Sequence, residues 1–447
     1  MIRQNFNADW TVEKGDGNSR MNSFLGNTQT KTVHLPYDAM IHEARTPDTK
    51  NGAQTGFYPG GEYIFQKHFT APQAWQGKPV SLVFEGVYQT ALVYLNGWLL
   101  TRNVNGYAEF TVEAGPYLKY GADNLLKVIA DNSLEPNSRW YTGSGIYRPV
   151  RLLVGNKVYL PQDTVRITTR EADEGFALLD VTAQVQSAST VTERVTLQQT
   201  ICREGTAVLT DRQNLLLQPG ESRTVSFRYC VDSPALWSPE NPNLYTSTMQ
   251  VLEGEEELDR EETGFGIRTL SIDAAHGVRI NGQTVKLRGA CIHHDNGILG
   301  AATLPDAEER RIRQLKEAGF NAIRSSHHPA GRALLDACDR YGVLVMDELS
   351  DVWNLRKNPY DYALYFEQDW KPTIQKMVAK DYNHPSVILY CVGNEISEAG
   401  SESGAETNRR LCNTFRELDP TRYTTNALNG LMAAGYRLRE IMGDVMR

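Results

Sequence analysis

The chain contains 447 residues, 40% of them hydrophobic and 22% charged, with a formal net charge of −8 at pH 7. This length predicts about two to four domains with ample core, in an ordinary globular protein. The negative charge, without any basic run, argues against nucleic acid as a partner. No apolar stretch approaches the length needed to span a membrane, and the first residues have no signal-peptide core, so we expect a cytoplasmic protein without a membrane partner.

Residues 1–156 show the pattern of an all-β domain. Short apolar runs, clearest at 63–69, 81–85 and 91–95, are separated by turns rich in Gly, Pro and Asn. The third run ends in Asn96 and Gly97, a strong signal for a hairpin between two strands. The spacing of these runs predicts a β-sandwich.

Residues 157–271 continue the β pattern. Residues 180–186 and 224–229 alternate apolar and polar side chains, which is typical of strands with one face in water. The length of this segment and its strand spacing fit an immunoglobulin-like sandwich. We interpret the acidic stretch at 253–262 as a solvated hairpin tip rather than a binding site.

From residue 272 the pattern changes to alternating strands and helices, which indicates a parallel sheet. The predicted strands are 285–292, 321–324, 343–348, 387–392 and 422–427, and the predicted helices are 306–318, 332–341, 366–381 and 406–418. A closed (β/α)₈ TIM barrel needs eight strands, so residues 272–447 are expected to form an incomplete barrel with about five of them. Residues 438–445 resemble the start of another helix, and we expect that Arg447 is not the natural C-terminus.

The stretch 387–395 is the most informative part of the chain. Its six apolar or small residues at 387–392 predict a strand buried on both faces, and the run then ends in Gly-Asn-Glu. Active sites of barrels lie at the carboxyl ends of the strands. Asn394 and Glu395 could simply begin a loop. Three upstream strands also end in polar, ionisable residues, however, which favours a catalytic site.

The sequence resembles glycoside hydrolase family 2, which includes β-galactosidases, β-glucuronidases and β-mannosidases. His-Pro-Ser-Val at 384–387, followed by the apolar strand and Asn394-Glu395, is similar to the acid/base strand of that family. Further phrases of the family occur at 58–63, 84–88, 93–97, 143–150, 237–245 and 265–268. The resemblance covers nearly the whole chain and implies a jelly-roll domain at 1–156, an immunoglobulin-like domain at 157–271 and a catalytic barrel at 272–447.

A retaining glycosidase of this kind needs two carboxyl groups about 5–5.5 Å apart, one as acid/base and one as nucleophile. The resemblance assigns the acid/base role to Glu395. The family places its nucleophile at the end of the seventh strand, so we expect that residue beyond Arg447. The 447 residues by themselves are therefore expected to be inactive.

The resemblance also implies residues that bind the sugar. Asn394 is expected to hydrogen-bond the 2-hydroxyl, and Arg324 to keep the nucleophile charged. His327, in a Ser-His-His-Pro phrase at 326–329, is the position expected to face the sugar. His294 and Asp295 follow the first barrel strand and could fix sugar hydroxyls.

We expect no metal or other cofactor. Adjacent side chains such as those of His293 and His294 point to opposite faces of a strand, which disfavours a metal site there. Some β-galactosidases of the family bind magnesium in the loop after the third strand. This chain has Val352 near the position of the usual Glu and no His, so the magnesium ligands are not matched.

Two more residues of that loop are candidates for substrate binding. Glu348 ends the third strand and is interpreted as a structural or sugar-binding carboxylate. Trp353 could form a floor under the sugar or belong to the core, and the sequence favours neither.

The leading hypothesis is a retaining exo-β-glycosidase similar to β-galactosidases. β-Glucuronidase and β-mannosidase activities are the alternatives within the family, and a non-catalytic carbohydrate-binding fragment is the alternative from another class. The expected partner is a small β-glycoside or oligosaccharide. We also expect a homo-oligomer.

Overall fold

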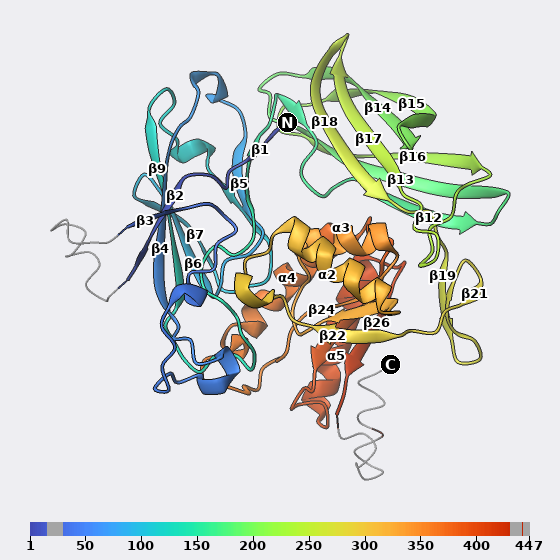
Figure 1. Cartoon of the computed structure of the whole chain (residues 1–447). Coiled ribbons are helices and arrows are strands. Elements are labelled where there is room, and N and C mark those ends of the chain that lie inside the picture. Colours follow the sequence, from blue (N-terminus) through green and yellow to red (C-terminus); the bar gives the residue numbers. More distant parts are fainter. Residues whose placement is uncertain (16–29, 430–439, 441–447) are drawn as a thin grey trace.

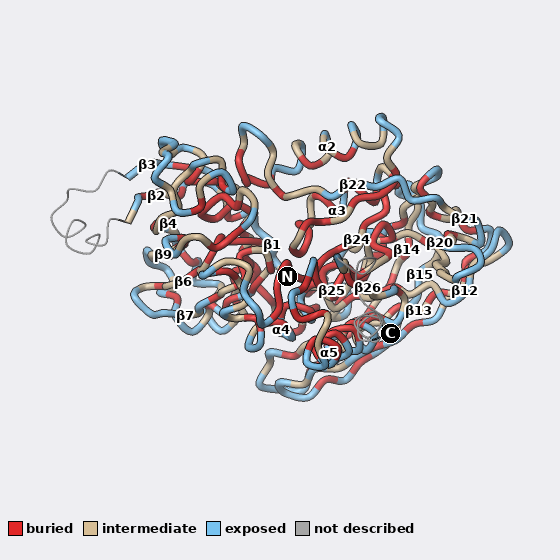
Figure 2. Tube along the Cα trace, turned by 90° about the horizontal axis from the view of Figure 1, so that it is seen from below, coloured by how far each residue is buried: buried red, intermediate tan, exposed pale blue. Residues whose placement is uncertain are grey.

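The computed structural model describes residues 1–15, 30–429 and 440. The predicted helix at 438–445 therefore lies outside the described residues, apart from Glu440. Two β-sandwiches flank a barrel segment that lies below and between them in the view of Figure 1. Figure 2 shows that the buried parts of the chain gather inside each of these units. Strands β24 and β25 lie in the buried interior of the barrel segment. Among the described residues, no helix combines the length and the apolar character needed to cross a membrane.

The first unit is a sandwich of two antiparallel sheets. One sheet has the order β1-β10-β5-β8, formed by Ile2–Asn5, Val150–Val154, Val80–Phe84 and Phe110–Glu113. The other has the order β3-β2-β4-β9-β6-β7, formed by Lys31–Val33, Trp10–Lys14, Gly61–Thr70, Asp123–Asn132, Thr90–Leu95 and Trp98–Asn103. Trp10, Phe65 and Phe84 fill the space between the sheets and are fully buried. The loop between β7 and β8 and the loop between β9 and β10 contact the barrel, and they contribute side chains to the site described below.

The second unit is also a sandwich of antiparallel sheets. In one sheet β11, β12 and β16 pair around β13, with the bounds Val158–Tyr159, Arg166–Ala172, Ser222–Asp232 and Phe176–Ser187. The other has the order β15-β14-β17-β18, formed by Thr206–Leu217, Glu193–Arg203, Tyr245–Glu253 and Glu256–Phe265. The alternation at 180–186 places Val181, Ala183 and Val185 in the core and their neighbours toward solvent, as expected for strands with one wet face.

A small antiparallel sheet connects this unit to the barrel. It consists of β19, β20 and β21, at Leu270–Asp273, Gly277–Ile280 and Gln283–Thr284. The amide of Val285 donates to the Val278 carbonyl of this sheet at 2.8 Å. The first barrel strand therefore begins at Gly289 rather than at the predicted residue 285, because the apolar run is shared between the connector and the barrel.

In the described part of the third unit, five parallel strands follow the order β22-β23-β24-β25-β26. They span Gly289–Ile292, Ala322–Ser325, Leu344–Glu348, Val387–Asn394 and Tyr423–Ala427. Four helices cover one face of this sheet, α2 at Pro305–Glu317, α3 at Arg332–Tyr341, α4 at Phe366–Asp381 and α5 at Glu402–Leu418. The predicted fold class, two sandwiches and a TIM barrel with five of eight strands, is confirmed. Helix α5 starts four residues earlier than predicted because Ser401 caps it by accepting from the Gly404 amide at 3.0 Å.

The helix-covered face of the sheet forms the barrel core. Val345, Val387 and Tyr390 from the strands pack with Leu335, Ile374 and Phe415 from the helices. The other face carries Ala290, Met346 and Leu389 along an apolar groove. Helix α3 ends at Gly342 with a φ of +65°, and a Cβ there would lie 2.3 Å from the Pro239 carbonyl oxygen. This close approach fastens the barrel to the end of the second sandwich.

Short 3₁₀ helices complete the described structure. They lie at Met40–His42, Gly52–Thr55, Gln73–Trp75, Gly115–Tyr117, Gly297–Leu299 and Tyr362–Leu364.

Candidate active site

Neighbouring parallel strands bring three predicted site residues together at their carboxyl ends. Arg324 lies on β23, Glu348 ends β24 and Asn394 ends β25. The Arg324 guanidinium donates through Nε to the Glu348 carboxylate and through Nη2 to Asn394 Oδ1 at 2.9 Å. His327 Nδ1 lies 3.0 Å from the second oxygen of Glu348. The parallel sheet thus assembles one hydrogen-bonded cluster from residues 70 positions apart.

Glu348 is the buried centre of this cluster. Its side chain is 0% exposed, and both oxygens are used by Arg324 and His327. Burial by itself would lower the pKa of Arg324, but the Glu348 carboxylate raises it above its usual value. Of the two roles considered for Glu348, structural or sugar-binding, its complete burial supports the structural one and disagrees with direct contact with a sugar. Its role is to orient Arg324 and His327, whose side chains are partly exposed.

Glu395 is the accessible carboxylate at the end of β25. Its side chain is 44% exposed. Its backbone has a φ of +44°, a left-handed conformation that a residue other than Gly rarely adopts, and its amide donates to the Ala427 carbonyl of β26 at 2.7 Å. Such strained residues cluster at functional sites. The strand therefore ends in a fixed turn that presents a carboxylate to solvent.

Asp351 organises the loop beside Glu395. Its Oδ1 accepts from Asn394 Nδ2 at 2.8 Å and from Lys357 Nζ at 2.9 Å. Burial would raise the pKa of Asp351, but the Arg139 guanidinium and Lys357, together with the Asn394 amide, hold it below its usual value. Asn394 is itself buried and bridges Arg324 and Asp351. Its predicted contact with a sugar hydroxyl stays a prediction.

The jelly-roll domain contributes two side chains that the sequence did not single out. Arg139, in the loop after β9, donates to Asp351 Oδ2 through Nε at 3.0 Å and to Oδ1 through Nη2 at 2.6 Å. Its Nη1 lies 3.5 Å from Glu395 Oε2. The next residue, Trp140, stacks on His293 with ring centroids 5.2 Å apart. The available signal was the neighbouring family phrase at 143–150.

The two histidines after β22 lie in different environments, and the one predicted to bind sugar is the buried one. His294 is buried, its Nε2 lies 2.9 Å from the Thr142 carbonyl oxygen, and burial lowers its pKa to about 3. The prediction that His294 binds sugar is therefore wrong. His293 instead lies beside the site, with Nδ1 2.7 Å from the Ser326 carbonyl oxygen. Asp295 is partly buried, and its contact with sugar stays a prediction.

Trp353 belongs to the core. It is 0% exposed and donates from Nε1 to the Val392 carbonyl at 2.9 Å. The interpretation of Trp353 as a floor under the sugar is wrong for this structure. The aromatic ring beside the site is Trp140, which is half-buried and meets the edge of His327 at 5.6 Å between centroids.

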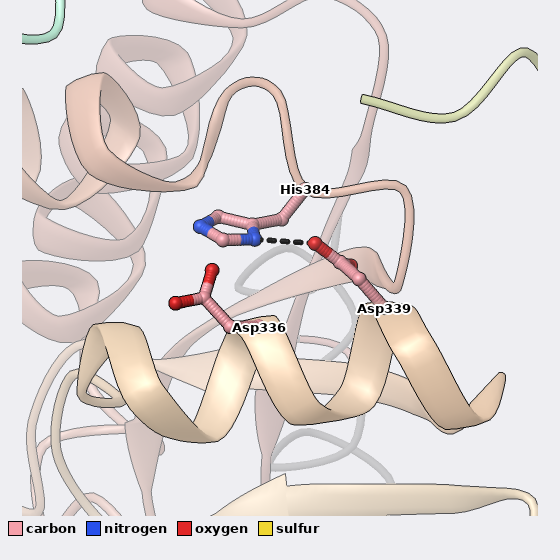
Figure 3. Close-up of side chains that lie close together, drawn as sticks. All are labelled: Asp336, Asp339 and His384. Atoms are coloured by element: carbon pink, nitrogen blue, oxygen red, sulfur yellow. Dashed lines mark hydrogen bonds and ion pairs between the residues drawn. The ribbon is translucent and has the colours of Figure 1, made fainter. Parts of the chain in front are cut away.

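Away from this site, Asp336, Asp339 and His384 form a group with the residue types of a metal centre (Figure 3). His384 Nδ1 lies 2.6 Å from Asp339 Oδ2, and the Ser386 amide donates to Asp339 Oδ1 at 3.0 Å. These contacts engage both oxygens of Asp339 and fasten the loop before β25 to helix α3. They give the group a structural role in holding the strand that carries Glu395.

Three family models match successive parts of the chain. A model described as "Glycosyl hydrolase 2 galactose-binding domain-like" matches residues 10–176, "Glycosyl hydrolases family 2" matches 158–268, and "Glycosyl hydrolases family 2, TIM barrel domain" matches 274–435. Together they follow the three structural units in order.

Individual proteins show the same likeness. The chain is 37% identical to the β-galactosidase BoGH2A of Bacteroides ovatus over 406 residues, which are 91% of this chain and 48% of that protein. It is 27% identical to a β-glucuronidase of Bacteroides fragilis, over 90% of this chain and 58% of that protein. A crystal structure of a glycosyl hydrolase family 2 member from Bacteroides cellulosilyticus superposes with a TM-score of 0.94 at 35% identity, over 99% of this chain and 58% of that one. The chain thus spans about half the length of the curated relatives it matches.

Proposed function

Because the chain belongs to glycosyl hydrolase family 2, we propose that the protein containing these residues is a retaining exo-β-glycosidase that removes a terminal β-linked sugar. The observation that supports this most directly is the exposed Glu395 carboxylate on a strained turn at the end of β25, beside buried and fully paired neighbours. We assign Glu395 as general acid/base. It donates a proton to the leaving oxygen and then accepts one from water.

The second carboxyl group of this mechanism is not supplied by the neighbours of Glu395. Glu348 is buried between Arg324 and His327, and Asp351 is held by Arg139 and Lys357. A carboxylate bound in this way is neither exposed nor free to attack an anomeric carbon. We propose that the nucleophile comes from a segment other than the described residues.

The site favours a neutral sugar. The cations that approach it, Arg139, Lys357 and Arg324, are each paired with a carboxylate of the protein. A glucuronide would need an uncommitted cation for its carboxylate, and the described site residues provide none. This favours a neutral β-glycoside over a β-glucuronide, and the name of BoGH2A, a β-galactosidase, supports a β-galactoside among the neutral substrates. β-Glucuronide, as in the Bacteroides fragilis relative, and β-mannoside are the alternatives.

We assign sugar contacts to His327 and Trp140. The His327 ring is oriented by Glu348 while part of it stays accessible. Trp140 places an apolar ring next to His327. An imidazole can hydrogen-bond a hydroxyl, and a flat aromatic ring suits the apolar face of a pyranose.

The test is hydrolysis of nitrophenyl β-galactoside, β-glucuronide and β-mannoside by the full product of the gene. We expect the galactoside to be hydrolysed fastest and Glu395→Gln to lose most of the activity on a β-linked disaccharide, whose leaving group needs a proton. Glu402→Gln is the matched control, because Glu402 is an exposed glutamate in the first turn of α5 and is not one of the hydrogen-bonded residues around Glu348 and Asp351. Absence of hydrolysis on all three substrates would instead support a non-catalytic carbohydrate-binding protein.

A further inference from the structure

We propose that Arg139, which the jelly-roll domain supplies, is a positioning residue for Glu395 and sets the pH range of acid catalysis. The role rests on the assignment of Glu395 as acid/base. It makes the first domain part of the proton-transfer machinery, although that domain lies more than 200 residues away in sequence.

The geometry fixes the guanidinium in one place. Two of its nitrogens, Nε and Nη2, bind the two oxygens of Asp351 at 3.0 and 2.6 Å. A planar guanidinium held at two points by a carboxylate has little rotational freedom. The third nitrogen, Nη1, is thereby aimed at Glu395 Oε2, 3.5 Å away.

Both ends of this arrangement are anchored. Asp351 is buried and also receives hydrogen bonds from Lys357 and Asn394. On the jelly-roll side, Trp140 follows Arg139 directly and donates from Nε1 to the Tyr107 hydroxyl at 3.0 Å, while its ring stacks on His293. The loop cannot withdraw without breaking contacts to both domains.

Charged side chains from two loops lie around Glu395. Arg139 approaches from the jelly-roll loop, Asp351 and Lys357 lie on the loop after β24, and β26 contributes only the Ala427 carbonyl to the Glu395 amide. Removing Arg139 takes a cation from Glu395 and also leaves the anion of Asp351 less neutralised. Both changes disfavour the charged form of Glu395.

The protonated and the charged forms of Glu395 are both needed in the catalytic cycle. Glu395 must carry a proton when the glycosidic bond breaks and must be charged when it activates water. Arg139 holds the carboxylate in one orientation, which proton transfer requires.

The first experiment measures kcat/KM against pH for the full gene product on a β-galactoside with a poor leaving group. In Arg139→Met the alkaline limb, which reports loss of the proton from the acid, should move upward on the order of half a pH unit or more. Arg139→Lys should restore most of the wild-type position. Arg102→Met is the matched control, because Arg102 also joins the jelly-roll domain to the barrel, over the Tyr365 ring, without reaching Glu395. An unchanged alkaline limb in Arg139→Met would overturn the proposal.

A second readout does not depend on activity. The full gene product is labelled with ¹³C at the glutamate carboxyl carbon, and the resonance of Glu395 is assigned by its disappearance in Glu395→Gln. Its titration midpoint should rise in Arg139→Met and stay in place in Arg102→Met. If the wild type hydrolyses no substrate, the proposed function fails while this titration still decides the role of Arg139. An identical midpoint in wild type and Arg139→Met refutes that role.

Discussion

Arg332, the first residue of α3, binds the Glu109 carboxylate of the jelly-roll domain with Nε at 2.8 Å and Nη2 at 3.0 Å. The same guanidinium contacts Asp163 of the second sandwich. One largely buried side chain therefore joins all three units. Desolvation would lower the pKa of Arg332, but these carboxylates raise it well above its usual value.

We expect Arg332→Met to destabilise the protein by about 3 kcal/mol, because it removes the cation paired with the partly buried Asp163 and leaves Glu109 with Arg151 alone. The measurement is urea-induced unfolding at pH 7. Arg340→Met, in the same helix, removes an exposed pair with Glu309 and should change the free energy of unfolding by less than about 1 kcal/mol. Equal effects of the two substitutions would contradict this account of the domain junction.

A second prediction concerns acid. His294 and His328 are buried between the jelly-roll domain and the barrel, and the His328 ring stacks on Tyr107 with centroids 4.1 Å apart. Burial lowers the pKa of His294 to about 3 and that of His328 well below its usual value. Between about pH 6.5 and 3 the unfolded chain binds protons that the folded protein excludes, so stability should fall as the pH decreases through this window.

The check is the unfolding midpoint at pH 7 and pH 4.5. His294→Gln keeps a donor for the Thr142 carbonyl but cannot titrate, so its loss of stability between the two values should be smaller than that of wild type. His68→Gln is the control, since the side chain of His68 is largely exposed. Parallel pH dependences of wild type and His294→Gln would show that this histidine is not a source of acid sensitivity.

The barrel strands could be predicted because each is a short apolar run that ends in polar residues. Parallel pairing then implied that Arg324, Glu348 and Asn394 meet, and the structure brings these side chains into hydrogen-bond contact. The start of the first strand was misplaced because residues from 285 pair with the connector instead. A periodic pattern does not tell which sheet an apolar run joins.

The rest of the site depends on contacts that local sequence does not encode. Arg139 and Asp351 are 212 residues apart, and no periodicity relates them. The burial of His294 was not foreseen because β22 ends at Ile292, and alternation no longer fixes side-chain direction once the chain leaves the strand. For Trp353 the sequence offered two environments, and only packing around Val392 decides between them.

A third prediction uses a buried carboxylate pair behind the site. Asp347 and Asp381 share one cation, Lys380, and are fully buried. Burial and the neighbouring Asp381 raise the pKa of Asp347 well above its usual value. The folded protein therefore retains a proton that the unfolded chain releases, and the stability that this gives at low pH is lost as the pH rises.

Asp347→Asn should mimic the protonated side chain, because its oxygen can still accept from the amides of Ala330 and Glu348. We expect its thermal midpoint to exceed that of wild type at pH 8 and to approach it at pH 5. Asp306→Asn, at an exposed aspartate in the first turn of α2, should show no such trend. A greater loss of stability in Asp347→Asn at pH 8 than at pH 5 would mean that Asp347 is charged in the folded protein.

The last prediction separates acid catalysis from a general defect in Glu395→Gln. A positioned general acid contributes about 10²–10⁴-fold to rate, and only when the leaving group needs a proton. In the full gene product Glu395→Gln should therefore lower kcat/KM by such a factor on a disaccharide and far less on a dinitrophenyl glycoside. Azide should partly restore turnover of the activated substrate, since the accessible space at Glu395 admits a small anion that can attack a glycosyl-enzyme intermediate. A glycosyl azide of retained configuration is the expected product. Equal losses on both substrates, without azide rescue, would show that Glu395 supports the fold of the site and does not transfer the proton.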